Sequence, residues 1–355
     1  MKKSATLSLP RFTPSRWLLT SLVLVVCALF SAYAPQMMPP PPGLTQAEAI
    51  GPFLNGKFPA LPPTGSGPGS YELENAFPNL TFIDPLKLVE VPGQNMFMML
   101  GKNGQVWSFA NDPATTQKTL ILDISARTII EGDGGALGMV LHPEFGQAGS
   151  PNRGYVYIWY RFAPVLQTIT GPNPQGGEQY GYLRLSRFTM ENGSATLNPA
   201  SEYILIQQFD RNCWHNGGDM FFGPDGFLYI SVGDEGGAND DYNVTQRINQ
   251  YLLGGVLRID VDQRGGAISH PIRRQPRTQI TPPAGWPQSY TQGYFIPNDN
   301  PWLNENGSQL EEFYAVGLRS PHRMTYDDQT GDIWVGDIGQ GAREEIDVIH
   351  KEDNL

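Results

Sequence analysis

Apolar and polar positions alternate along much of the chain after residue 75, in short runs rich in Tyr, Val, Ile, Trp and Phe. Each run follows a turn that contains glycine, and this combination is typical of β-strands. The clearest runs are PGQNMFMMLGKNGQVWSFA from Pro92, RGYVYIWYRF from Arg153, PDGFLYISVGD from Pro224 and TGDIWVGDIG from Thr330. The pattern predicts an all-β fold without a long amphipathic helix, with at most a turn or two of helix at 244–255.

The strand runs do not form a strict repeat, because their turn glycines are unevenly spaced. This spacing excludes the common solenoids and suits antiparallel blades that carry loop insertions. The largest insertion covers residues 263–300 and is rich in Pro, Arg and Gly. It is either a surface loop near the mouth of a site or an exposed excursion, and the sequence leaves both interpretations open.

The N-terminus has the pattern of a targeting signal. Basic residues precede an apolar run at 17–30, and Ala-Tyr-Ala occupies 32–34. This order is that of a secretory signal peptide. Pro35 would follow the cut and is a poor residue for cleavage, so residues 1–34 are either a signal peptide or an N-terminal membrane anchor. In both cases we expect the folded part to lie outside the cytoplasm, in the periplasm or outside the cell.

The segment 35–75 contains PPPPG and PPTGSGPGS and shows no apolar period. A Pro/Gly-rich composition of this kind predicts an extended, mobile linker. Residues 76–355 are then the predicted folded domain. Apolar residues make up 40% of the chain, which is enough for a sizeable core.

Charge and cysteine content exclude several classes of function. The formal net charge of -11 disfavours nucleic acid and anionic lipid as main partners, since both bind cationic surfaces. Of the two cysteines, Cys27 lies in the N-terminal apolar run. The folded domain therefore has Cys213 alone and cannot build a disulfide framework or a cysteine-based zinc site. We expect Cys213 to be a small buried filler rather than a catalytic thiol.

Common catalytic and nucleotide-binding motifs, such as H-E-x-x-H, the P-loop and G-x-S-x-G, do not occur in the sequence. The Gly-rich stretch EGDGGALG at 131–138 does not match G-x-G-x-x-G, which argues against a dinucleotide-binding fold. The acidic stretch GDEGGANDD at 233–241 does not match an EF-hand loop. We interpret it as a solvated loop, with a calcium loop as the alternative.

The stretch CWHNGGDMFFGPDGFLYISVGD, from Cys213 to Asp234, places a histidine and an aspartate on either side of a tight turn. His215 begins one predicted strand, Asp234 ends the next, and the turn at 223–226 joins them as an antiparallel hairpin. Because the two residues lie about equally far from the turn, they are predicted to meet at one end of the hairpin. A carboxylate there can hold the imidazole in one tautomer and strengthen it as a base. From the residues alone, a structural histidine remains the other interpretation.

Four long motifs follow one another in a familiar order: EGDGGALGMVLHPEF, HNGGDMFFGPDGFLYISVGD, LLGGVLRIDVD and YAVGLRSPHRMTYDDQTGDIWVGDIGQGAREEIDVI. From about residue 80 to its last residue the chain resembles the soluble glucose and aldose sugar dehydrogenases that use pyrroloquinoline quinone (PQQ). The same domain occurs in Hedgehog-interacting proteins. The resemblance implies a six-bladed β-propeller with PQQ at the channel mouth. By proportion, this chain is expected to form an incomplete propeller of about four blades.

The resemblance also implies roles for individual residues. His215 occupies the position of the base that removes the sugar C1 hydroxyl proton while hydride passes to the quinone, and Asp234 occupies that of its partner. Arg319 matches the arginine that hydrogen-bonds the quinone oxygens. Ser320 follows at a cofactor-contacting position that is usually Asn in the family. Asp133 matches a polar position at the pocket edge, although an aspartate of the turn is an equally good interpretation.

A calcium ion accompanies PQQ in the family, bound partly by two successive backbone carbonyls. These carbonyls correspond to Gly339 and Gln340 in this sequence. Backbone oxygens are suitable calcium ligands, and calcium acts as a Lewis acid on the quinone. The expected cofactors are therefore PQQ and Ca²⁺.

The expected function is that of an oxidoreductase, which oxidises an aldose at C1 and passes the electrons to an external acceptor. The chain ends at HKEDNL, where relatives continue into further blades whose basic residues hold the cofactor carboxylates. We therefore expect a fragment of a longer protein, and a truncated chain would be expected to lose activity. The alternative is a non-catalytic propeller that binds a protein or carbohydrate, as in the Hedgehog-interacting relatives.

Overall fold

The computed structural model describes residues 73–164, 179–341 and 343–350, all within one unit of the chain, Ala49–Leu355. The predicted signal or anchor at 1–34, and nearly all of the predicted linker, lie outside the described residues. The described part consists of β-strands and loops with a single short 3₁₀ helix, Ser125–Arg127, which confirms the all-β prediction. No described helix is long and apolar enough to cross a membrane.

The first two sheets are antiparallel, and each follows chain order from its first strand outward. The first sheet has the order β1-β2-β3-β4, with β1 (Pro85–Glu90), β2 (Met96–Gly101), β3 (Gln105–Ala110) and β4 (Thr119–Asp123). The second has the order β5-β6-β7-β8, with β5 (Ala136–Leu141), β6 (Tyr155–Phe162), β7 (Gly181–Met190) and β8 (Leu197–Asp210). The short strand β13 (Tyr290–Thr291), from the 263–300 insertion, pairs with β8 as a fifth strand.

The third and fourth sheets continue the same plan. The third has the order β9-β10-β11-β15, with β9 (Met220–Phe222), β10 (Leu228–Val232), β11 (Gly255–Ile259) and β15 (Phe313–Val316). The fourth has the order β16-β17-β18, with β16 (Pro321–Tyr326), β17 (Ile333–Asp337) and β18 (Glu345–Ile349). Within the insertion, β12 (Ser269–Pro271) pairs with β14 (Phe295–Pro297) as a separate two-stranded ribbon.

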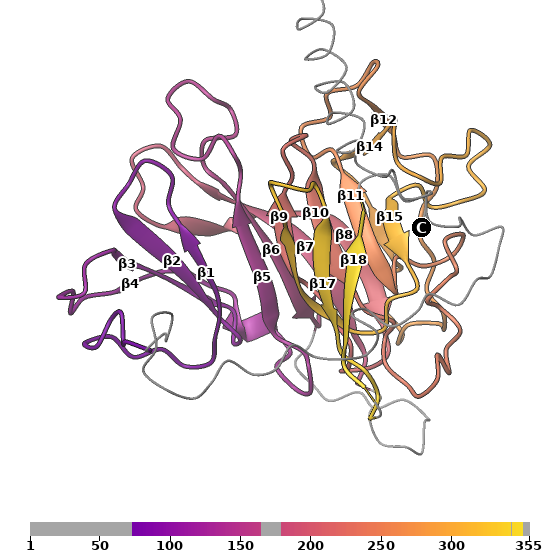
Figure 1. Cartoon of the computed structure of the whole chain (residues 1–355), viewed down its shortest axis with the longest axis horizontal. Helices are drawn as coiled ribbons and strands as arrows, with labels where there is room; N and C mark the ends of the chain where they lie inside the picture. Colours follow the sequence, from indigo (N-terminus) through magenta and orange to yellow (C-terminus); the bar gives the residue numbers. More distant parts are fainter. Residues whose placement is uncertain (1–72, 165–178, 342, 351–355) are drawn as a thin grey trace, which may run out of the picture. The chain divides into compact units, whose positions relative to one another are not determined.

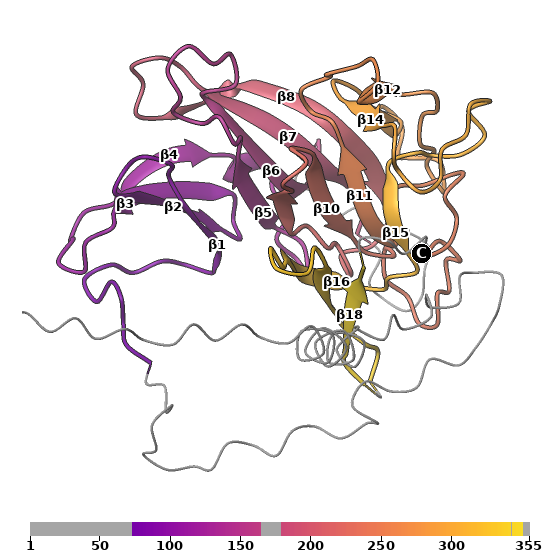
Figure 2. The ribbon, with the colours of Figure 1, turned by 45° about the horizontal axis from the view of Figure 1, so that its top comes forward.

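The four sheets are the blades of a propeller-like arrangement, as predicted (Figures 1 and 2). The first strand of each blade faces its neighbours: β1 contacts β5, β5 contacts β9, and β9 contacts β16. Asp219, which directly precedes β9, joins three of these inner strands. Its carboxylate accepts from Lys87 Nζ of β1 at 2.5 Å and from the Met324 amide of β16 at 3.1 Å. The Asp219 side chain thus bonds the inner edges of the first, third and fourth blades to one another.

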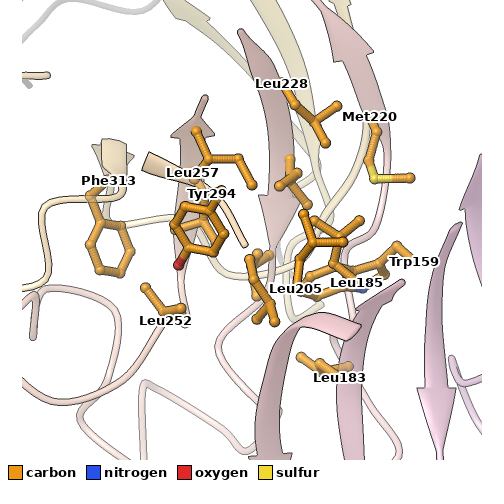
Figure 3. Packing of buried hydrophobic residues seen from close by; sticks show 14 of the residues in the cluster. Trp159, Leu183, Leu185, Leu205, Met220, Leu228, Leu252, Leu257, Tyr294 and Phe313 are labelled. Carbon is orange, nitrogen blue, oxygen red and sulfur yellow. The ribbon is translucent and has the colours of Figure 1, made fainter. Parts of the chain in front are cut away.

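Apolar side chains between consecutive blades form the core. The largest cluster lies between the second and third blades and includes Trp159, Leu185, Leu205, Met220 and Leu228 (Figure 3). Full burial of one such side chain is worth about 1.5–3 kcal/mol relative to exposure, so this interface holds the two blades firmly together. The same strands carry the candidate site at their ends.

Candidate active site

The β9–β10 hairpin brings His215 and Asp234 together. A tight turn joins the strands, in which Gly226 has a left-handed φ of 77°. Strand β9 begins at Met220, whereas the sequence predicted a strand that begins at His215. The pairing nevertheless continues beyond it, since the Gly218 amide donates to the Ser231 carbonyl at 2.8 Å. The His215 Nδ1 atom therefore lies 2.6 Å from Asp234 Oδ1.

Asp234 fixes the tautomer of the histidine. Its side chain is only 2% exposed, and Oδ1 also accepts the Gly236 amide at 2.8 Å. An ionised carboxylate can only accept, so Nδ1 of the imidazole donates, and Nε2 of the neutral ring carries the lone pair. Nε2 is then the basic atom. The arrangement is that of a general base with its orienting acid.

The main chain around His215 is held in an unusual conformation. His215 has a left-handed φ of 57°, which is uncommon outside glycine. Its amide donates to Asp133 Oδ2 at 3.0 Å, and the Asp133 amide donates back to the Cys213 carbonyl at 2.8 Å. Gly233 allows the close approach on the other side, because a Cβ there would lie 1.9 Å from the His215 carbonyl oxygen. The Asp133 carboxylate thus binds the backbone of the histidine.

Arg319 joins this group from the fourth blade. Its carbonyl accepts the Asp234 amide at 2.9 Å, so the main chains of the dyad and of the predicted quinone-binding segment are directly bonded. The amides of Arg319 and Ser320 donate to the two carboxylate oxygens of Asp337 at 2.8 and 2.5 Å. Burial raises the pKa of Asp337, while these two amides act in the opposite direction. Ser320 is buried, and its main chain is fixed at the end of β17.

The predicted calcium ligands lie beside the same arginine. Arg319 Nη1 donates to the Ile338 carbonyl at 2.7 Å and to the Gly339 carbonyl at 3.2 Å. The side chain of Gln340 turns elsewhere, and its Oε1 accepts the Asn239 amide at 3.1 Å. The Gly339 carbonyl therefore already accepts from the Arg319 guanidinium, and a cation bound to that oxygen would have to displace this contact. Within 73–164, 179–341 and 343–350, no cluster of three His, Cys, Asp or Glu residues could hold a metal, so a cation there would depend on such carbonyls.

Burial contradicts one sequence interpretation and agrees with another. The first part of the acidic stretch 233–241 is buried rather than solvated, with Asp234 at 2% and Glu235 at 1% exposure. That prediction was wrong because two carboxylates at the end of a hairpin turn inward to bind backbone and guanidinium groups. Cys213 is 8% exposed, and burial raises the pKa of its thiol, which disfavours the thiolate. This agrees with a filler role.

Sequence reasoning missed Glu235 and its partner Arg211. The Glu235 carboxylate accepts the Arg211 amide at 2.6 Å, Arg211 Nε at 3.2 Å and Gln279 Nε2 at 2.9 Å. Gln279 belongs to the 263–300 insertion, so that insertion reaches the residue next to Asp234. The adjacency of Glu235 to Asp234 in the sequence was the one available signal. Adjacent acidic residues usually mark a solvated loop, and no period or motif distinguished this pair.

Comparison with protein families decides the membership of the chain. The model of the glucose/sorbosone dehydrogenase family matches residues 82–279 and 291–355. This chain belongs to the glucose/sorbosone dehydrogenase family. The matched range contains all four blades apart from Tyr290 of β13, and every residue of the site described above.

Individual relatives divide between two kinds of protein. The chain is 37% identical over 142 residues to the HIPL1 protein of Arabidopsis thaliana, covering 39% of this chain and 18% of the relative. It is 28% identical over 202 residues to human Hedgehog-interacting protein, covering 56% and 23%. It is 22% identical over 238 residues to quinoprotein glucose dehydrogenase B of Acinetobacter calcoaceticus, covering 63% and 40%. The chain thus spans less than half the length of each of these relatives.

Solved structures agree with the fold. The soluble aldose sugar dehydrogenase from Escherichia coli, in its apo form, superimposes with a TM-score of 0.50 at 18% identity, covering 79% of this chain and 63% of that one. At this identity the likeness concerns the fold alone. The described residues therefore form an all-β, propeller-like arrangement of four blades, as predicted.

Proposed function

We propose that the protein oxidises an aldose sugar at C1, with His215 as the general base and PQQ as the hydride acceptor. Hydride leaves an alcohol carbon readily only when the hydroxyl proton departs as well, so the reaction requires a positioned neutral base. Nε2 of His215 would take that proton, and the Asp234 carboxylate would stabilise the imidazolium that forms. The 2.6 Å contact between Nδ1 and Oδ1 is the observation that carries the proposal.

The residues around the dyad suit the cofactors of the family. Arg319 would donate to the quinone oxygens, since a guanidinium is a suitable partner for developing negative charge. Ser320 would lie beside the cofactor in place of the usual Asn, and the Asp133 carboxylate would keep the histidine in place. The carbonyls of Gly339 and Gln340 would hold Ca²⁺, which supplies Lewis-acid polarisation of the quinone when it is bound. PQQ supplies the two-electron acceptor.

The proposed partners follow from this chemistry. They are an aldose substrate and an external electron acceptor, which the reduced cofactor requires before a second turnover. A periplasmic or extracellular location, with the segment 1–34 as signal peptide or membrane anchor, would give access to both.

The second candidate is a non-catalytic propeller that binds a protein or carbohydrate. The similarity to Hedgehog-interacting protein favours it. The contact between Arg319 and the Gly339 carbonyl also favours it, because a permanent contact of this kind would compete with a cation for that oxygen. The dyad favours the enzyme, since binding alone does not require an imidazole with a fixed tautomer.

One experiment separates the two candidates. The full-length protein, with any blades beyond residue 355, is incubated with CaCl₂ and PQQ, and the reduction of a redox dye is followed with a panel of aldoses. We expect quinone-dependent activity in the wild type, and at least a roughly 10²-fold loss in His215→Ala. His350→Ala is the matched control, because His350 also bonds an aspartate, Asp332, through Nδ1 at 3.0 Å but is exposed. Absence of activity with every sugar would favour the binding propeller, and an active His215→Ala would remove the histidine from its role.

A further inference from the structure

Glu235 is a buried glutamate that the proposed reaction does not use. It directly follows Asp234, is 1% exposed, and has a left-handed φ of 70°. This backbone conformation is unfavourable for a residue with a side chain, and burial of a carboxylate is unfavourable without strong partners. Contacts of the side chain must therefore hold the residue in place.

Those contacts come from two other segments of the chain. Oε1 accepts the Arg211 amide at 2.6 Å, and Oε2 accepts Arg211 Nε at 3.2 Å and Gln279 Nε2 at 2.9 Å. The guanidinium carbon of Arg211 lies 3.4 Å from the centroid of the Tyr242 ring. Arg211 also donates to Gln279 Oε1. Glu235 thus closes a ring of hydrogen bonds between the end of β8, the β10–β11 loop and the insertion.

The two adjacent carboxylates bind two ends of one short segment. Asp234 holds His215, while Glu235 holds Arg211 four residues earlier. The amide of Gly236, on the other side of Glu235, donates to the same Asp234 oxygen that faces the imidazole. A shift of the Glu235 backbone would therefore move the orienting carboxylate and the histidine segment relative to each other.

Charges around Glu235 are paired rather than isolated. Asp210, at the end of β8, accepts Arg161 Nε at 2.9 Å, and both side chains are at most 1% exposed. Burial and the nearby Asp210 raise the pKa of Glu235, and Arg211 acts in the opposite direction. The geometry favours the ionised carboxylate over the protonated one, because Glu235 accepts from three donors and a protonated carboxyl would turn its O–H toward one of them.

We propose that Glu235 is a positioning residue for the His215–Asp234 pair, anchored by Arg211 and by Gln279 of the insertion. This inference rests on the proposed function for its effect on catalysis, and on the hydrogen-bond geometry for its effect on the histidine ring. It also gives the 263–300 insertion a role, since Gln279 connects it to the site.

The test replaces the Glu235 carboxylate without changing its size. Glu235→Gln keeps one acceptor for the Arg211 amide but turns an NH₂ group toward two donors, Arg211 Nε and Gln279 Nε2. The matched control is Glu312→Gln, because Glu312 is also 1% exposed and accepts from the Tyr294 hydroxyl at 2.7 Å, away from the dyad. Gln279→Ala is a milder variant, which removes one contact of Glu235 from a partly exposed position.

Two measurements are made on each variant. The first is kcat and KM with PQQ, calcium and the best aldose. We expect Glu235→Gln to lower kcat about 10- to 100-fold, as misplacement of a base does, with KM changed by less than about threefold. Gln279→Ala is expected to lower kcat several-fold, and Glu312→Gln to leave it unchanged.

The second measurement is the tautomer of the His215 ring, read from its side-chain ¹⁵N chemical shifts and assigned with His215→Gln. We expect one tautomer, protonated at Nδ1, in the wild type and a mixture in Glu235→Gln. An altered tautomer in a protein without dehydrogenase activity would support the positioning role while refuting the proposed function. Unchanged kcat and unchanged ¹⁵N shifts in Glu235→Gln, or equal changes in Glu312→Gln, would overturn the positioning role.

Discussion

Replacement of Asp234 by asparagine tests the dyad most directly. The variant has the same size, but the Oδ1 position, which binds both His215 Nδ1 and the Gly236 amide, becomes either a neutral amide oxygen or an NH₂ group that cannot accept from Gly236. The wild-type contact is 2.6 Å long and joins two buried side chains, of which Asp234 is 2% exposed. A hydrogen bond to a charged group in such a place contributes about 1.5–3 kcal/mol. The imidazolium formed during proton transfer would lose that stabilisation.

This free energy sets the expected loss of rate. Since each 1.36 kcal/mol changes a rate tenfold, kcat is expected to fall roughly 10- to 150-fold from the lost charge pair alone. A change of tautomer would add to this loss, because Nε2 would then carry the proton and could not act as a base. KM should change little, since the aspartate contacts the histidine rather than the sugar.

The assay is steady-state dye reduction with saturating PQQ and calcium, combined with circular dichroism to verify the fold. Asp332→Asn is a close control. Asp332 Oδ1 also accepts from a histidine Nδ1, that of His350, at 3.0 Å, but the pair is exposed in the fourth blade. If Asp234→Asn stays within about threefold of wild type, or if both variants lose activity equally, the assignment of a base and orienting acid is wrong.

Three further predictions concern backbone approach, pH and calcium. Gly233→Ala is expected to lower stability by about 1–3 kcal/mol and to reduce activity, because its Cβ would lie 1.9 Å from the His215 carbonyl oxygen. Gly336→Ala is the control: the atom nearest to its Cβ would lie 3.7 Å away, so it should behave as wild type in thermal unfolding and dye reduction. Burial raises the pKa of Glu312 from 4.5 to about 7, so the folded state binds the proton more tightly than the unfolded state does. The free energy of unfolding should therefore fall by on the order of 3 kcal/mol as the pH rises from 5 to 8. Urea titrations of Glu312→Gln should no longer show this pH dependence. If the Gly339 carbonyl binds Ca²⁺, millimolar calcium should raise Tm and EGTA should reverse the rise; an unchanged Tm would contradict that ligand.

The hairpin and its dyad could be predicted from the sequence because their determinants are local. A Gly-Pro-Asp-Gly turn fixes where two strands reverse, and counting outward from it pairs residue 215 with residue 234. The run of Tyr, Val, Ile, Trp and Phe in RGYVYIWYRF likewise identified β6. Hydrophobic periodicity and turn-forming residues act over a few consecutive positions, so both can be identified directly from the sequence.

Contacts between blades could not be predicted in this way. Asp219 bonds Lys87 and the Met324 amide, which lie 132 and 105 residues away in the chain. No short pattern records such a partnership, because each residue alone resembles an ordinary loop or strand residue. The pairing of β13 with β8 could not be predicted for the same reason, because the register of a two-residue strand is set by its partner strand and not by its own sequence.

Backbone conformation at the site supports chemistry over passive binding. His215 and Glu235 are both buried and both have positive φ, and each such residue costs about 1–2 kcal/mol. Among the residues that the structure describes, the other non-glycine residues with positive φ are not buried: Asp84, Asn239, Asp240, Asn243 and Gln263. Strain of this kind persists only where surrounding contacts determine it, and it is concentrated at functional sites. Here those contacts are hydrogen bonds: the Asp133 carboxylate accepts from the His215 amide, and the Glu235 carboxylate accepts from the Arg211 amide. A non-catalytic propeller that binds its partner through surface loops does not require one imidazole to be fixed in this way. The strained conformation of His215 therefore favours its role as a base.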